Sequence, residues 1–580
     1  MKRQIVFVFG SQACVPDDGL LAARQLGCEA TVLGAKLACC MSADLVDRFE
    51  RVDLSRPEQV VETARRIHAV HPIDAVVSYD DQAGPIAARV AAALGLRGHP
   101  VESADSARDK LWMKQRFEAA GIPIAAYTLA EDEDDAVDWA EEVGYPVVVK
   151  PVRGSASQGV IRADDEDELR DAYRRLRRIV QEYRLDCGDR SNRQQLVEKY
   201  IEGDEFSVEL LVRDGVPTVL CVFEKPQPLE GPFFEETIYV SPARLDEDAR
   251  QRLESLAVRG VQALGLRDGA AHCEIRGNGE EMYILEIGGR LIGGACSRVF
   301  RHVLGEDIHP HVLRLALGEA EELPKQKPGA AGAMMLPIPK AGKLRSIRGL
   351  DRARQVRGIE DVILNTSPGE IIVPFPEQSC YVGFLTASGE NVEQVEEALS
   401  EAASLIELDL APLCCETWRR AVADQRSYRA ADEHGIRSLE GLARERAEEL
   451  ILPLVTATYF GEYPEDIGLD RAKQCFDWFA QGNRGETSPE AWFVSEGRGV
   501  ALGSSRGDIC YVSLLGVLPQ ARKSGLGEAL MRSIMSFYAR KGLTQVEVAV
   551  EPTQPGSTAL FRKLGFAPEN CDAAECCSSC

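Results

Sequence analysis

A short apolar run that ends in a lysine and passes into a glycine- and serine-rich loop constrains the fold of this chain more than any other feature. The run is Pro146–Lys150, and the loop continues through Gly154, Ser155, Ser157 and Gly159. Such a junction sets a positive charge beside backbone N–H groups that can wrap a polyphosphate. Alone, the pattern also fits a plain strand and hairpin. The elements around it are therefore needed to distinguish that hairpin from a polyphosphate site.

Length and charge limit the classes of protein to which the chain can belong. At about 150 residues per domain, 580 residues predict roughly three to five units. The formal net charge of -25 repels phosphodiester backbones, so nucleic acid is not an expected partner. No run reaches the ~18 apolar residues that span a bilayer, and the first apolar run stops at Gly10, as a strand would. We therefore expect a cytoplasmic protein without a membrane partner.

Alternating strand-like and helical runs organise the first hundred residues. Apolar runs, the first at Ile5–Phe9, alternate with helical stretches such as Gly19–Leu26. This order predicts a parallel α/β domain over residues 1–102. The pair Gly10-Ser11 follows the first run without a GxGxxG pattern, so we interpret it as a tight turn that holds no cofactor.

Shifts in composition divide the rest of the chain. Mixed helical and strand-like runs fill the segment after the first domain, and a stretch rich in Pro, Gly, Lys and Ala marks the next boundary. The predicted fold class is a multidomain α/β and α+β chain. The expected units are an α+β domain at 103–323, a smaller α/β subdomain at 324–423, a linker at 424–445, an α/β domain at 446–568 and a cysteine-rich tail at 569–580.

The elements around the lysine-ended run favour a nucleotide site over a plain hairpin. Lys110 opens a helix upstream, and Gln195–Glu209 downstream reads as strand, break and strand. This order resembles the ATP-grasp superfamily, in which adenine lies between two α+β lobes. The resemblance covers about residues 1–410 and implies ATP as a cofactor. It implies that Lys110 and Lys150 hold the phosphates, beneath a flap formed by Gly154–Gly159 with Ser155 and Ser157. The adenine hinge would then be Glu198, Tyr200 and Ile201. Glu205 would contact the ribose or the hinge, with a structural cap as the alternative role.

Two carboxylates in neighbouring apolar runs form the candidate metal site. Glu274 lies in one run and Glu286 in the next, and Mg²⁺ prefers hard oxygen ligands. Burying two acids without a cation costs on the order of several kcal/mol, so we expect both to be magnesium ligands. Many ATP-grasp enzymes carry an asparagine two residues after the second glutamate. This chain has Gly288 there, which leaves the number of magnesium ions open.

The resemblance also implies a reaction. In ATP-grasp ligases the γ-phosphate passes to a substrate carboxylate, and an amine then attacks the acyl phosphate. Arg290 and Lys150 are the expected catalytic cations, since a guanidinium binds phosphoryl oxygens bidentately. His272 either orients a carboxylate or acts on the incoming amine. The runs around Glu274 and Glu286 look most like the L-amino-acid ligase branch, which implies small carboxylate and amine substrates that resemble amino acids.

A second anion-binding pattern lies near the C-terminal end of the sequence. The apolar run Ile509–Val517 is followed by Arg522-Lys-Ser-Gly525-Leu-Gly527 at the start of an amphipathic helix, where N–H groups can face an anion. The ending Ser557–Phe566 follows at the usual spacing and completes a resemblance to the GNAT acetyltransferases. The resemblance implies acetyl-CoA, bound at Val517, Arg522, Gly525 and Gly527. A glycine-rich turn without CoA is the alternative.

The last GNAT motif departs from the family. Phe561 stands where a tyrosine commonly protonates the leaving thiolate, and Gln554 where an asparagine is usual. The proton for the leaving thiolate would then come from water, Tyr511 or Tyr538. Two interpretations of the chain follow: a bifunctional ligase and N-acetyltransferase, or a ligase regulated by an acetyl-CoA-sensing domain. The substrates, the acetyl acceptor and homodimer formation are left open.

A cysteine-rich tail ends the sequence. Cys576, Cys577 and Cys580 place three thiols close together, and thiolates select soft ions such as Zn²⁺ or a metalloid. This pattern predicts a soft-metal site, for which a loose tail without a ligand is the alternative. A third interpretation of the whole chain, a protein that binds soft metals through this tail, follows from it.

Overall fold

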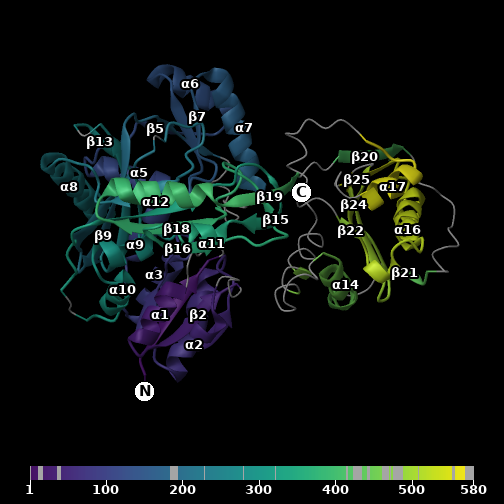
Figure 1. The fold of residues 1–580 in the computed structure, drawn as a ribbon, viewed down its shortest axis with the longest axis horizontal. Coiled ribbons are helices and arrows are strands. Elements are labelled where there is room, and N and C mark those ends of the chain that lie inside the picture. The colour runs from purple at the N-terminus through teal and green to yellow at the C-terminus, as the bar shows by residue number, and fades with distance from the viewer. Residues whose placement is uncertain are drawn as a thin grey trace. The chain divides into compact units, whose positions relative to one another are not determined.

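The computed structural model divides into two compact units, Met1–Asp409 and Leu410–Cys580, each with hydrophobic cores of its own (Figure 1). Within the described residues, no helix is long and apolar enough to cross a bilayer. The cysteine-rich tail lies outside them. The structure describes residues 2–10, 17–35, 41–182, 194–227, 229–278, 280–319, 322–412, 416–421, 434–439, 444–459, 469, 472–473, 488–506, 509–550 and 555–568.

A parallel four-stranded sheet opens the first unit, and the predicted parallel α/β fold is confirmed. Its elements are β1 (Gln4–Phe9), α1 (Asp17–Gln25), β2 (Glu29–Gly34), η1 (Ala43–Leu45), β3 (Arg48–Arg51), α2 (Pro57–Val70), β4 (Ala75–Val77) and α3 (Gly84–Leu94). The strand order is β3-β2-β1-β4. Every residue of β1 is buried, because its side chains alternate between a core under α1 and a core under α2 and α3.

An antiparallel four-stranded sheet with two helices forms a small lobe. In Figure 1 the lobe and the N-terminal sheet lie on opposite sides of the rest of this unit. Its elements, with the two helices that lead into it, are α4 (Val101–Arg108), α5 (Lys110–Ala119), β5 (Tyr127–Ala130), α6 (Glu133–Val143), β6 (Val147–Lys150), β7 (Ile161–Ala163), α7 (Glu166–Glu182) and β8 (Gln195–Lys199). The strand order is β5-β8-β6-β7, so the lysine-ended strand β6 lies inside the sheet.

An eight-stranded antiparallel sheet forms the body of the first unit, with the order β13-β12-β9-β10-β11-β14-β18-β16. Its elements are β9 (Asp204–Arg213), β10 (Val216–Lys225), β11 (Ile238–Ser241), α8 (Glu247–Leu264), β12 (Gly269–Gly277), β13 (Met282–Gly288), α9 (Cys296–Val303), α10 (Ile308–Ala316), β14 (Ala330–Leu336), β16 (Ile359–Leu364), β18 (Gly383–Gly389) and α12 (Val392–Ser404). The expected subdomain 324–423 therefore continues the sheet of the domain before it.

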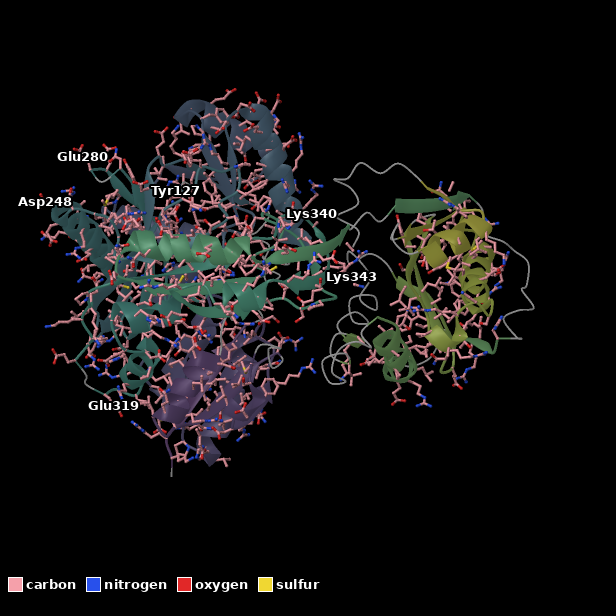
Figure 2. The ribbon with its side chains drawn as sticks, in the orientation of Figure 1. Tyr127, Asp248, Glu280, Glu319, Lys340 and Lys343 are labelled. Carbon is pink, nitrogen blue, oxygen red and sulfur yellow. The ribbon has the colours of Figure 1, made fainter. Side chains whose placement is uncertain are left out.

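A small sheet and an exposed charged surface complete this unit. The sheet has the order β17-β15-β19. Exposed acidic side chains such as Asp248 and Glu280 project from the surface, in keeping with the net negative charge (Figure 2). The remaining elements are β15 (Gly342–Arg348), α11 (Leu350–Ala353), β17 (Ile371–Ile372) and β19 (Glu407–Pro412).

The second unit is built on one seven-stranded sheet with the order β21-β22-β23-β24-β25-β20-β26. Its elements are β20 (Glu416–Ala421), β21 (Ile436–Ser438), α14 (Arg444–Tyr459), β22 (Ser488–Ser495), β23 (Gly499–Arg506), β24 (Ile509–Val517), η3 (Pro519–Ala521), α16 (Leu526–Arg540), β25 (Gln545–Val550), α17 (Pro555–Lys563) and β26 (Ala567–Pro568). The parallel pair β24 and β25 is in register only from Ile509 to Val512, so the second half of β24 runs on without β25.

Strand β20 takes a place in this sheet that its position in the sequence does not predict. It precedes the other strands of the unit, yet it lies between β25 and β26 and pairs Trp418 with Val548. The expected boundaries put β20 in the subdomain 324–423 and β21 in the linker 424–445. In the structure both strands belong to the second unit, and the first unit ends at Asp409.

The position of β20 predicts where the second unit can be cut. A fragment of residues 410–580 keeps β20 between β25 and β26. A fragment of residues 446–580 lacks β20, so β25 and β26 each lose a hydrogen-bonded neighbour. We expect the longer fragment to unfold cooperatively on heating and the shorter one to aggregate or to show no transition. Circular dichroism melting curves at equal concentration measure the difference. Equally cooperative transitions would contradict the prediction.

Candidate active site

One cavity of about 230 Å³ in the first unit collects the residues that the sequence nominates for ATP and metal. Its walls come from the loop after β4, from β6 and the loop that follows it, and from the strands β8, β12 and β13. Residues as far apart in the sequence as Tyr79 and Phe384 thus reach one space. The nominated residues that line it are Lys110, Lys150, Ser155, Ser157, Glu198, Tyr200, Ile201, Glu205, His272, Glu274, Glu286 and Arg290.

The two candidate metal ligands face each other across paired strands. Glu274 on β12 is the register partner of Glu286 on β13, and both line the cavity. Lys110 Nζ donates to Glu286 Oε1 at 3.0 Å and to the Gly154 carbonyl at 3.1 Å. Two carboxylates side by side at a cavity wall are the hard oxygen donors that Mg²⁺ prefers, so the residues present fit that ion.

A buried lysine that the sequence analysis missed lies among three carboxylates. Lys225 Nζ, at the end of β10, is 2.5 Å from Glu205 Oε1, 2.7 Å from Glu236 Oε1 and 3.4 Å from Glu274 Oε1. Burial lowers the pKa of Lys225, but the three carboxylate charges outweigh it and raise that pKa well above its usual value. Glu205, expected at the ribose or the hinge, is therefore turned toward this ammonium group, which offsets the negative charge of the carboxylates at the candidate metal site.

His272 lies between two carboxylates. Its Nδ1 is hydrogen-bonded to Glu209, another residue that the sequence analysis missed, and its Nε2 is 3.2 Å from Glu274 Oε1. Burial lowers the pKa of His272, but the Glu209 charge and hydrogen bond raise it to about 10. Of the two roles left open for His272, these contacts favour the orientation of the Glu274 carboxylate.

Arg290 is held by an aspartate from the N-terminal domain. Its Nε and Nη2 donate to the two carboxylate oxygens of Asp81 at 2.9 and 2.7 Å. Burial raises the pKa of Asp81, but the Arg290 charge outweighs it and holds that pKa below its usual value. A Cβ on Gly288 would lie 3.3 Å from Asp81 Oδ1. The space beside Gly288, where other ATP-grasp enzymes carry an asparagine, is therefore bordered by this ion pair.

Glu198 is paired with two lysines at the cavity, one of them the candidate phosphate ligand Lys150. Its Oε1 is 2.6 Å from Lys150 Nζ and 3.1 Å from Lys114 Nζ. Burial lowers the pKa of Lys114 to about 8. From the sequence we expected Glu198 at the adenine hinge. Its backbone lies in β8, but its side chain is paired with Lys150 and Lys114. Lys114 was missed, although it lies one helical turn beyond Lys110 on the same face of α5.

Two arginines hold the ring of Tyr200 in the cavity wall. The Arg162 and Arg276 guanidinium carbons lie 4.4 and 4.9 Å from the centroid of the Tyr200 ring, and Arg276 Nη2 donates to the Tyr200 hydroxyl at 2.6 Å. Phe234 stacks on the same ring at 6.2 Å. The aromatic and apolar surface of Tyr200, Ile201 and Phe234 in this wall suits an adenine ring.

In the second unit, the nominated acetyl-CoA residues lie where β24 separates from β25. Val517 ends β24, and Arg522 Nε donates to its carbonyl at 3.1 Å. Gly525 is the N-cap of α16, with φ of 88° and no capping side chain. The Leu526 N–H at the start of α16 donates to Ser524 Oγ at 3.4 Å. The N–H groups that follow it in the first turn point toward this end of the helix, as at any helix N-terminus. A bulky side chain at Gly525 would approach His434, which the sequence analysis did not consider.

The aromatic residues of this unit divide between core and sheet. Phe561 is buried and packs on Phe566 at 5.5 Å, and the Tyr538 ring is fully buried in the same core. Tyr511 is half-buried on β24. Of the two tyrosines left open as proton donors, only Tyr511 is within reach of solvent. Gln554 lies outside the described residues.

Comparisons with known proteins agree with this geometry. A solved structure of an L-amino acid ligase from Bacillus licheniformis superposes with a TM-score of 0.60 at 26% identity, over 71% of this chain and 99% of that protein. The alanine–anticapsin ligase of Bacillus subtilis is 26% identical over 47% of this chain, and the chain spans 60% of that ligase. The L-arginine-specific L-amino acid ligase of Bacillus subtilis is 23% identical over 57% of this chain and 79% of that protein.

Family models match four stretches of the sequence. The fold and the cavity define an ATP-grasp protein with a second α/β domain attached. The chain carries an ATP-grasp domain of the L-amino-acid-ligase-like branch and, after it, a GNAT domain. The matches are the ATP-grasp N-terminal domain at 20–98, the ATP-grasp domain at 143–299, the L-amino acid ligase C-terminal domain 2 at 334–411 and the acetyltransferase (GNAT) family at 457–566.

The Asp81–Arg290 pair predicts a coupled effect on stability. Asp81→Asn leaves the buried Arg290 charge without its partner, so we expect the first unit to lose about 3 kcal/mol or more of unfolding free energy. The double variant Asp81→Asn with Arg290→Gln removes both charges and is expected to recover part of that loss. Chemical denaturation followed by fluorescence measures both. A double variant as unstable as the sum of the two single ones would show that the residues do not act as a pair.

Proposed function

We propose that this chain is an ATP-dependent ligase that joins a carboxylate to the amine of an amino-acid-like substrate. The convergence of every nominated ATP-site residue on one cavity carries the proposal. The L-amino acid ligase from Bacillus licheniformis supports it, because this chain matches nearly the whole of that protein. The relatives' own substrates are not carried over, since the sequence identity is about one quarter.

ATP and Mg²⁺ are the cofactors that the residues fit. Glu274 and Glu286 would hold Mg²⁺, Lys110 and Lys150 the phosphates, and the surface beside Tyr200 the adenine. When bound, Mg²⁺ supplies charge neutralisation at the phosphates. The residues of the chain that would cover the phosphates belong to the loop after β6.

The proposed reaction passes through an acyl phosphate. The substrate carboxylate attacks the γ-phosphorus, ADP leaves, and the amine then displaces phosphate from the acyl carbon. Lys150 and Arg290 stabilise the negative charge on the transferring group. Asp81 fixes the direction of the Arg290 guanidinium, and His272 that of the Glu274 carboxylate. The protein's part is thus to position reactants and to place cations.

Charge removal at the phosphate end tests the ligase proposal. We expect Lys150→Ala and Glu286→Ala each to lower amine-dependent ADP release at least about a hundredfold, because each acts on the charge around the phosphates. Glu280→Gln, an exposed acid outside the cavity, is the matched control and is expected to be unaffected. A coupled ADP assay with pooled amino acids measures the rates. Release of AMP and pyrophosphate in place of ADP would contradict the acyl-phosphate route.

We further propose that the second unit binds acetyl-CoA and transfers its acetyl group to an amine, which makes the chain bifunctional. The separation of β24 from β25 beside the N-terminal end of α16 favours this proposal. In the alternative proposal, this unit senses acetyl-CoA and regulates the ligase. Separate measurement of ADP and free CoA distinguishes them: no free CoA with any amine, together with acetyl-CoA-dependent ADP release, would support regulation.

The acetyl-CoA assignment can be tested by binding. Gly527→Trp places an indole at the start of α16, where the pyrophosphate would approach the backbone, so we expect acetyl-CoA affinity to fall at least about tenfold. Arg522→Glu reverses an exposed charge at the same loop and is expected to weaken binding without disturbing the core. Isothermal titration of both variants, with a melting curve for each, measures the effect. Unchanged affinity in both would remove the assignment.

A further inference from the structure

Three lysines and two carboxylates meet at the candidate phosphate site. Lys110 Nζ is paired with Glu286 at 3.0 Å. Lys150 Nζ and Lys114 Nζ lie 2.6 and 3.1 Å from one and the same oxygen of Glu198, its Oε1. Three ammonium groups thus face two carboxylates. A group of side chains with a surplus positive charge is suited to the negative charge of a polyphosphate.

Lys114 differs from the other two lysines in its position. Lys110 and Lys150 line the cavity, whereas Lys114 is not among the lining residues. The Lys114 side chain is 2% exposed, and its Nζ lies 5.3 Å from the centroid of the Tyr127 ring. Tyr127 on β5 is the register partner of Glu198 on β8. A nucleotide in the cavity would therefore contact Lys150 and not Lys114.

The burial of Lys114 is not explained by a need to neutralise Glu198. Glu198 already has a closer partner in Lys150, and the transfer of a second ammonium group out of water costs free energy. Burial, with smaller contributions from Lys150 and Lys110, lowers the pKa of Lys114 to about 8 against the opposing Glu198 charge. A buried cation in excess of the carboxylate that it faces points to a role in binding an anion.

A phosphate that binds Lys150 competes with Glu198 for the same ammonium group. Glu198 is buried, and burial raises its pKa, but the Lys114 and Lys150 charges outweigh burial and hold that pKa below its usual value. If Lys150 were its one partner, a phosphate at Lys150 would leave a buried carboxylate charge unpaired, which is strongly unfavourable. With Lys114 at 3.1 Å, Glu198 keeps a cation.

We propose that Lys114 is a positioning residue for the nucleotide, because it keeps Glu198 paired when the Lys150 ammonium group turns to a phosphate. The inference rests on the proposed ligase function and adds to it a residue that acts through Glu198 and touches no substrate. The flexible four-carbon stem of a lysine lets Lys150 exchange one anionic partner for another. Lys114 thereby frees Lys150 for the phosphates.

Neutral substitutions of Lys114 in the full-length protein test this role. We expect Lys114→Met and Lys114→Gln to lower the affinity for adenylyl imidodiphosphate with Mg²⁺, a non-hydrolysable ATP analogue, at least about tenfold. Lys114→Arg keeps the charge and is expected to bind the analogue more tightly than either. Lys340→Met is the control, because Lys340 is exposed and lies outside the cavity (Figure 2). Calorimetric titration measures each affinity.

Stability without nucleotide gives a second and opposite readout. In Lys114→Met the pair of Lys150 with Glu198 remains, so we expect the melting temperature of the protein without nucleotide to be unchanged or higher. A purely structural lysine would lower the melting temperature when it is replaced. The inference therefore predicts weaker nucleotide binding in a protein that is no less stable.

A double variant tests whether Lys114 acts through Glu198. Lys114→Met combined with Glu198→Gln removes the carboxylate that competes for Lys150. We expect this double variant to bind the analogue at least about fivefold more tightly than Lys114→Met alone. No recovery in a folded double variant would show that Lys114 does not act through Glu198 and would overturn the inference.

The remaining outcomes separate this inference from the ligase proposal. Unchanged affinity in folded Lys114→Met and Lys114→Gln, or failure of both variants to fold, would overturn the inference and leave the ligase function standing. If the unaltered protein binds the analogue but no amino acid causes ADP release, the ligase proposal fails, and the affinities still decide the role of Lys114. If the unaltered protein does not bind the analogue, both proposals fail.

Discussion

The cavity of the first unit depends on buried positive charges that are held by carboxylates from other elements. Leaving a buried cation without its partner lowers the free energy of unfolding by on the order of several kcal/mol, well above the contribution of a surface ion pair. Each buried pair therefore constrains the positions of the two elements that carry it. These pairs therefore fix the walls of the cavity as well as its charge. The pairs are Lys110 with Glu286, Lys150 with Glu198, Lys225 with Glu205 and Glu236, and Arg290 with Asp81.

The same pairs connect parts of the chain that fold around different cores. Asp81 comes from the N-terminal parallel sheet and Arg290 from the end of the large antiparallel sheet, with separate hydrophobic clusters under each. Lys110 opens the helix before the small lobe and reaches Glu286 on β13. A cavity at such a junction receives side chains from several directions, which is what the proposed transfer between two bound substrates would require. The second unit, by contrast, completes its own sheet with β20.

Much of the site could be predicted because each part of it follows a local pattern. A lysine at the end of an apolar strand identified Lys150, and neighbouring apolar runs identified Glu274 and Glu286. The same lysine pattern also marks Lys225, at the end of β10, and was overlooked there because no glycine-rich loop follows. Asp81 has no local signal at all. It follows a short strand in a loop, and only its partner 209 positions away gives it a role.

The sequence by itself determined the order of the domains, the parallel first sheet and the residue types of both candidate nucleotide sites, because strand and helix periods and glycine-rich turns depend on neighbours along the chain. Only the tertiary structure decided which charges meet. It turned Glu198 and Glu205 toward lysines, placed β20 between β25 and β26, and paired Arg290 with Asp81. Those outcomes depend on contacts between residues far apart in the sequence. The free energy of such contacts is set by burial and by the pairing of buried charges, and local periodicity carries no information about either.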